Sequence, residues 1–120
     1  MQKKILVADD DDFMLLSIKA VLTSNGYTVI ESSDGVEAVA AFKEHHPDCV
    51  LLDGLMPNLD GFSACKEIRN LPEGKAVPIL LVSGLSKDEI KESHPDTMAT
   101  GYISKPLDWE TLIKKVEKVL

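Results

Sequence analysis

Short apolar runs alternate with amphipathic segments along the whole chain. Five of these runs have the length of a strand and are apolar almost throughout, which is typical of strands that are covered on both faces. The predicted strands are residues 4–8, 27–31, 48–53, 77–83 and 101–104.

Predicted helices fill the intervals. The first keeps its apolar residues at helical spacing through Leu22 and stops at Asn25-Gly26. The second starts at Asp34, which with Glu37 forms a D-x-x-E pattern, and runs to about His45. The third opens at Asp60-Gly61, with one apolar face: Phe62, Cys65 and Ile68. The segment KDEIKES predicts a short polar fourth helix.

Asp108 is expected to cap the last helix. Trp109 is expected to pack this helix onto the sheet. Its predicted buried stripe is Leu112, Ile113, Val116, Val119 and Leu120.

Five repeats of strand then helix predict an α/β fold, with a parallel sheet, right-handed crossovers and helices on both faces. A chain of 120 residues is expected to form one domain, residues 1–120. In such open sheets, ligands bind beyond the carboxyl ends of the strands, where the strand order reverses. The residues that follow each strand are therefore the candidates for chemistry.

The net charge of −7 argues against a nucleic-acid or anionic-membrane surface and is compatible with cation binding. No apolar stretch reaches the roughly 18 residues of a membrane span, and we expect no signal peptide before the first strand. We therefore expect a cytoplasmic protein, in which Cys49 and Cys65 are buried thiols rather than a disulfide.

Acidic, hydroxyl and basic side chains stand at four strand ends. Asp9 and Asp10 follow the first strand, Asp53 ends the third, Ser83 ends the fourth and Lys105 follows the fifth. If those strands are neighbours, these residues converge, and three carboxylates so close repel one another unless a cation lies among them. Oxygen ligands alone indicate a hard ion such as Mg²⁺. Lys105 adds a positive charge and Ser83 a hydroxyl donor, and together they suit the binding of a phosphoryl group.

Here the sequence resembles the receiver domain of two-component response regulators, of the chemotaxis single-domain kind, over essentially its entire length. The resemblance is carried by Asp9-Asp10, LLDGLMPNLDG around Asp53, VSG at 82–84 and SKP at 104–106. It implies a flavodoxin-like three-layer fold with strand order 2-1-3-4-5, and Mg²⁺ as cofactor.

The resemblance also implies residue roles. Asp53 becomes the phosphoacceptor; Asp10, Asp53 and the Leu55 carbonyl ligate Mg²⁺, and Asp9 supports the metal through water. Lys105 and Ser83 hold the phosphoryl oxygens. Tyr102 turns inward once Ser83 has moved, although a plain edge-strand aromatic is the alternative. Pro57 and Gly61 shape the loop after the acceptor strand, and the Lys105-Pro106 bond is cis.

The implied partners are a sensor histidine kinase or a histidine phosphotransfer protein, and an unknown effector. Phosphorylation is expected to switch the surface of the fourth helix, fifth strand and fifth helix, with phosphorylation-dependent homodimers as an option. Nucleic acid and membrane are not expected as direct partners. Enzymatic turnover is not expected beyond self-phosphorylation from small donors and slow self-dephosphorylation.

Two features depart from the family pattern. Ser83 replaces the commoner threonine, and Gly84 beside it leaves an uncovered approach to the phosphoryl group. Pro95 disfavours helix at His94, so we expect the fourth helix to stop near Ser93 and a loop to follow to about Thr100.

Three other functions fit the sequence less well. A Mg²⁺-dependent phosphohydrolase typically needs D-x-D on the nucleophile strand, and here Leu55 takes the second position. A binding-only pseudo-receiver would have lost site residues. Flavin binding needs a Ser/Thr/Gly-rich loop after the first strand, where this chain carries Asp9 to Asp12.

Of those four aspartates, Asp11 and Asp12 are expected to start the first helix, one of them as its cap.

Overall fold

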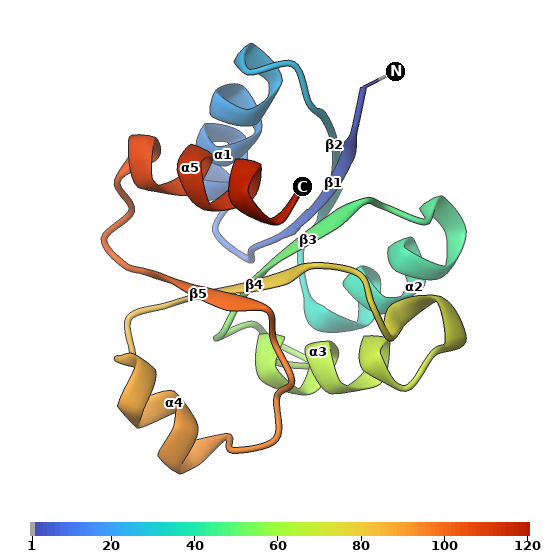
Figure 1. The fold of residues 1–120 in the computed structure, drawn as a ribbon, viewed down its shortest axis with the longest axis vertical. Coiled ribbons are helices and arrows are strands. Elements are labelled where there is room, and N and C mark those ends of the chain that lie inside the picture. Colours follow the sequence, from blue (N-terminus) through green and yellow to red (C-terminus); the bar gives the residue numbers. More distant parts are fainter. Residues whose placement is uncertain (1) are drawn as a thin grey trace.

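The computed structural model describes residues 2–120, in which strands and α-helices alternate strictly (Figure 1). The strands are β1 (Lys4–Ala8), β2 (Thr28–Ser32), β3 (Cys49–Asp53), β4 (Ile79–Ser83) and β5 (Gly101–Ser104). The helices are α1 (Asp12–Ser24), α2 (Gly35–His45), α3 (Gly61–Arg69), α4 (Lys87–Ser93) and α5 (Trp109–Val119), and a 3-10 turn, η1 (Pro72–Gly74), follows α3.

The five strands form one parallel sheet in the order β2-β1-β3-β4-β5. This confirms the predicted fold class and strand order. The most continuous apolar runs, β3 and β4, are buried at every residue, whereas the edge strands β2 and β5 remain partly exposed. The strand order reverses between β1 and β3, so the carboxyl ends of these two strands flank the place where such folds bind ligands.

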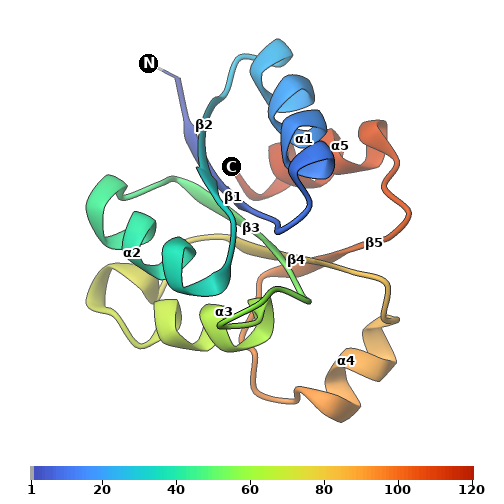
Figure 2. The same ribbon diagram turned by 180° about the vertical axis from the view of Figure 1, so that it is seen from behind.

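Helices cover both faces of the sheet. Helices α1 and α5 lie on one face and α2, α3 and α4 on the other (Figures 1 and 2). Each face has its own apolar core: Leu15, Ile18 and Leu22 of α1 pack with Leu112 and Val116 of α5 on the first. On the second, residues of α2 and α3 pack with a single residue of α4, Ile90.

The buried stripe predicted for α5 is wrong at Leu120, and the packing expected for Trp109 differs as well. Leu120 is 39% exposed because the helix ends at Val119 and the last residue lies beyond it. Trp109 is 37% exposed and lies in a groove between α1 and α5, with Val21 and Ile113, rather than against the sheet.

Side-chain caps start the helices where the sequence predicted them. Asp34, Asp60 and Asp108 each accept a hydrogen bond from a backbone N–H of the first turn. The cap of α4 was not predicted: Ser86 forms a reciprocal capping box with Glu89.

Helix α4 ends at Ser93, and residues 94–100 connect it to β5, as expected from Pro95. Both cysteines are free and buried, also as expected. Among the described residues, no helix is long and apolar enough to cross a membrane.

Candidate functional site

The predicted site residues lie at one edge of the sheet. Asp9 directly follows β1, Asp53 and Ser83 end β3 and β4, and Lys105 directly follows β5. Because these four strands are neighbours and parallel, their carboxyl ends meet at the same edge. The structure therefore brings together residues that the sequence separates by up to about a hundred positions.

Three carboxylates form a compact cluster. Oxygen atoms of Asp9, Asp10 and Asp53 all lie within 4.8 Å of one another. Asp9 and Asp53 are buried, while Asp10 is exposed. Burial is the largest cause of a raised pKa at Asp9; the charges of Asp53 and Asp10 add to it, and a hydrogen bond from Asp11 N–H and the charge of Lys105 oppose it.

This cluster fits a hard divalent cation. Asp9 Oδ1 accepts a hydrogen bond from Asp11 N–H at 2.9 Å, but Asp9 Oδ2 is buried and has no donor within the described chain. A buried acceptor without a donor, beside two further carboxylates, is a set of atoms that Mg²⁺ can satisfy. Asp12 lies outside the cluster, and Asp11 caps α1, accepting from the N–H of Phe13 at 2.9 Å.

Lys105 brings a positive charge to the buried carboxylate. Its Nζ lies 3.0 Å from Asp53 Oδ1, with the lysine side chain 33% exposed and the aspartate side chain 7% exposed. The Lys105-Pro106 peptide bond is cis, as the resemblance implied. A cavity of about 280 Å³ opens here; its lining residues are Asp53, Leu55, Ser83, Gly84, Leu85 and Lys105.

Ser83 has a hydroxyl hydrogen to offer. Its Oγ accepts the N–H of Leu85 at 3.0 Å, which leaves its own hydrogen for another acceptor. Gly84 borders an open approach, because a Cβ built there meets no heavy atom within 4 Å. Leu55 is 76% exposed at the mouth of the cavity.

Two glycines, Gly54 and Gly61, allow the start of α3 to pack closely against the end of β3. A Cβ on Gly61 would lie 2.0 Å from the Asp53 carbonyl oxygen, and Gly61 N–H donates to the Gly54 carbonyl at 3.0 Å. A Cβ on Gly54 would lie 2.8 Å from the ring of Phe62, which fills the space beneath it. The start of α3 is thus held directly against the end of β3, as expected for Gly61.

Tyr102 lies on the edge strand β5, opposite Leu81 of β4, and is half-buried. Its hydroxyl lies 3.3 Å from Thr97 Oγ1. The sequence did not point to Thr97, because a threonine in a loop after a proline carries no local signal of a contact with a strand residue.

A family model described as "Response regulator receiver domain" matches residues 5–117. Protein PilH of Pseudomonas aeruginosa is 32% identical over 117 residues, which cover 98% of this chain and 97% of PilH. Several other curated relatives are longer, and the chain spans about half of them, 49% and 51% in two cases.

Solved structures agree in fold over the whole chain. The chemotaxis protein CheY4 of Vibrio cholerae has a TM-score of 0.94 at 32% identity, with 100% of both chains covered. The receiver domain of sensor histidine kinase PA1611 from Pseudomonas aeruginosa has a TM-score of 0.92 at 29% identity, covering 99% of this chain and 98% of that one. That structure is described with a magnesium ion coordinated in its active-site cleft.

Proposed function

The chain belongs to the response regulator receiver domain family of two-component signalling, and on this premise we propose that Asp53 accepts a phosphoryl group from a phosphohistidine of a partner protein. The observation that carries the proposal is the contact of Lys105 with a buried Asp53 beside two further carboxylates. Residues 1–120 act as one receiver domain in this proposal.

In the transfer step, a carboxylate oxygen of Asp53 attacks phosphorus and forms an acyl phosphate. The phosphorus–nitrogen bond to the donor imidazole breaks, its electron pair stays on that nitrogen, and the nitrogen takes a proton from water. Lys105 Nζ and the Ser83 hydroxyl then donate to phosphoryl oxygens, which supports the negative charge of the transferred group.

The proposed metal is Mg²⁺, held by Asp10, Asp53 and the backbone carbonyl of Leu55, with Asp9 acting through water. When bound, Mg²⁺ offsets the negative charge of the carboxylates and of the phosphoryl group. The orphaned Asp9 Oδ2 supports this assignment from the protein side.

Phosphorylation is proposed to act on downstream partners by changing the surface of the domain. Ser83 shifts toward the phosphoryl group, Tyr102 follows, and the surface of α4, β5 and α5 is altered for downstream partners. The proposed phosphodonor is a sensor histidine kinase or a histidine phosphotransfer protein in the cytoplasm; homodimerisation on phosphorylation is part of the same proposal.

A phosphohydrolase is the less favoured function. The residue two positions after Asp53 is Leu55, whose apolar side chain has no proton to give or take. Loss of the phosphoryl group should therefore be slow and limited to attack by water on the protein's own acyl phosphate.

The test is incubation with Mg²⁺ and acetyl phosphate, followed by intact mass, for the wild type and Asp53→Asn. A stoichiometric, acid-stable and base-labile adduct that is lost in the variant supports the proposal. Rapid multiple turnover of the donor would instead indicate a hydrolase, and no adduct would indicate a binding-only domain.

A further inference from the structure

Residues 94–100, here called the strap, connect α4 to β5 and pass beside α3, on the sheet face opposite to α1 (Figures 1 and 2). Four α3 residues that contact the strap through their side chains fall at helical spacing, on one stripe of that helix. They are Phe62, Cys65, Lys66 and Arg69.

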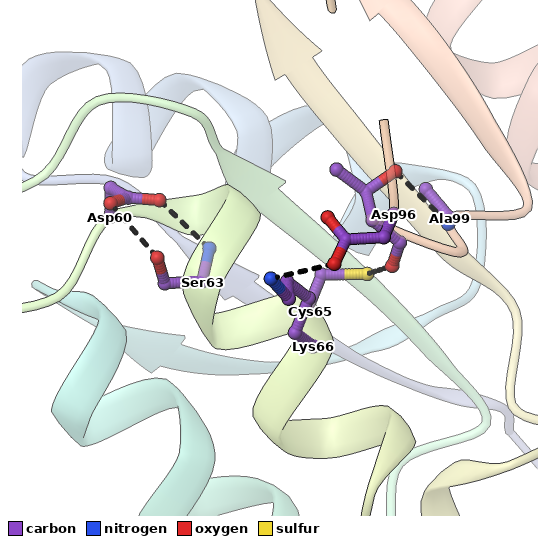
Figure 3. Close-up of polar contacts among 7 residues, drawn as sticks. Asp60, Ser63, Cys65, Lys66, Asp96 and Ala99 are labelled. Carbon is purple, nitrogen blue, oxygen red and sulfur yellow. Dashed lines mark hydrogen bonds and ion pairs between the residues drawn. The ribbon is translucent and has the colours of Figure 1, made fainter. Parts of the chain in front are cut away.

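The middle of the strap is fixed by two adjacent residues of that stripe (Figure 3). Lys66 Nζ lies 3.0 Å from Asp96 Oδ2, and Cys65 Sγ donates to the Thr97 carbonyl at 3.1 Å. Burial raises the pKa of the Cys65 thiol to about 11, so the thiol keeps the hydrogen that it donates. Thr97 is therefore anchored through its backbone, not through its side chain.

The two ends of the strap are also attached to α3. Arg69 Nε donates to the Met98 carbonyl at 2.8 Å, and Arg69 Nη2 lies 3.2 Å from Thr100 Oγ1. At the other end, the His94 ring stacks on Phe62 with ring centroids 4.0 Å apart and planes 6° apart. The strap is thus a fixed element rather than a loose loop.

The Thr97 hydroxyl is left to contact Tyr102. Thr97 is 2% exposed, and its Oγ1 lies 3.3 Å from the Tyr102 hydroxyl and 3.5 Å from Ala99 N (Figure 3 shows the contact with Ala99). Since the Ala99 N–H donates to Oγ1, the threonine hydrogen can go to the tyrosine oxygen.

Tyr102 and Ser83 lie on the same face of the sheet. Tyr102 is paired with Leu81, both pack into the core beside α3, and Ser83 is two residues beyond Leu81 on the same strand, hence on the same side. The ring of Tyr102 therefore lies on the side of the sheet from which it can approach Ser83 if that hydroxyl leaves the Leu85 N–H. Such a rotation would carry the tyrosine oxygen away from Thr97.

We propose that Thr97 is a positioning residue whose hydroxyl holds Tyr102 in its resting orientation, while α3 holds Thr97 in place. This inference rests on the proposed function, which it extends: phosphorylation at Asp53 must break the Thr97–Tyr102 contact before the tyrosine can follow Ser83. The contact therefore biases the domain toward its resting state.

The test uses Thr97→Val, which removes the hydroxyl with little change of shape, and Thr97→Ser, which keeps it. Self-phosphorylation by acetyl phosphate should be faster in Thr97→Val by about two- to tenfold, the range that one neutral hydrogen bond supports. Thr97→Ser should phosphorylate at the wild-type rate. An equal change in both variants, or none in either, overturns the proposal.

Fluorotyrosine labelling gives a second readout that does not need phosphorylation. The chain has two tyrosines, so Tyr27 serves as an internal reference for Tyr102 in the ¹⁹F spectrum. Without phosphodonor, Thr97→Val should move the Tyr102 signal and leave that of Tyr27 in place. If the wild type takes up no phosphoryl group, the proposed function fails, but this shift still decides whether the contact holds the ring.

Tyr102→Phe breaks the same contact from the other side and leaves Thr97 in place should Thr97→Val fold poorly. It should raise the phosphorylation rate by a similar factor, and the double variant should gain no more than either single variant. An unchanged rate in Tyr102→Phe, or additive effects in the double variant, contradicts the proposal.

Discussion

Lys105 Nζ lies 3.0 Å from Asp53 Oδ1, so the carboxylate proposed to accept the phosphoryl group is already paired with a cation in the resting protein. The aspartate is almost fully buried, and the lysine reaches it from the partly exposed rim of the cavity. A phosphoryl group added to Asp53 therefore meets a positive charge that is in position beforehand, which reduces the reorganisation needed during transfer.

Replacing Lys105 with methionine should slow phosphorylation of Asp53 by acetyl phosphate by roughly 10- to 1,000-fold, because a preorganised donor to the developing charge is lost. Intact mass against time measures the rate. Lys114→Met is a matched control, since Lys114 pairs with Glu110 on the surface of α5 and should leave the rate unchanged. Equal rates for wild type and Lys105→Met would contradict the role given to this lysine.

Replacing Asp10 with alanine should weaken Mg²⁺ binding by at least about tenfold, whereas Asp12→Ala should change it little. Asp10 belongs to the carboxylate cluster, and Asp12 lies in the first turn of α1 outside it. Calorimetric titration with MgCl₂ measures both affinities. Similar losses in the two variants would mean that the whole acidic run, rather than the cluster, attracts the ion.

Asp9→Asn should stabilise the metal-free protein at pH 7 by about 1 kcal/mol, because it removes a buried charge with one unsatisfied oxygen. Urea denaturation in the presence of EDTA measures the free energy of unfolding. Added Mg²⁺ should raise this free energy in the wild type and much less in the variant. A variant that is less stable than the wild type without metal would contradict the assignment.

The raised pKa of Asp9 fixes the sign of the pH dependence in the metal-free protein. Below the ordinary value of 3.8, the native and unfolded states both hold the proton. As pH rises through 3.8 and then through the raised native pKa, the unfolded chain loses its proton first, so the stability contributed by Asp9 falls. The stability gained by Asp9→Asn should therefore grow over that window and then stay constant.

Four other carboxylates have a lowered pKa, and none of them is changed by the substitution: Asp34, Glu89, Asp96 and Asp108. Hydrogen bonds from the first turns of α2 and α5 lower the pKa of Asp34 and Asp108, so their contributions to stability are lost as pH falls. Both are present in wild type and variant alike, and the difference between the two proteins isolates Asp9.

Gly61→Ala should destabilise the protein by about 1–3 kcal/mol, because its Cβ would lie 2.0 Å from the Asp53 carbonyl oxygen and would force α3 away from β3. Gly84→Ala has open space around its Cβ and should stay within about 0.5 kcal/mol of the wild type. Thermal and urea unfolding compare the two. Equal stabilities would show that the start of α3 is not held as tightly as its contacts indicate.

Local sequence signals predicted the elements and most of their ends. β5 and the end of α4 lie where GYIS and Pro95 indicated, since a strand-length apolar run and a helix-breaking residue act within a few positions. β4 was predicted two residues too long because Pro78 has no N–H to donate to a neighbouring strand, and the paired strand begins at Ile79. Such strand ends depend on which strands pair with each other, and the periodicity of the sequence carries no information about that pairing.

The sequence by itself determined the α/β fold and the set of polar residues at the strand ends, because a parallel sheet brings the carboxyl ends of its strands to one edge. Tertiary structure alone decided which atoms meet there: the 3.0 Å contact of Lys105 with Asp53 and the orphaned oxygen of Asp9. It also decided that α3 holds the strap and that Thr97 reaches Tyr102. Contacts between α3 and the strap join residues about 30 positions apart, and their geometry exists only once α3 and α4 are packed on the same face of the sheet.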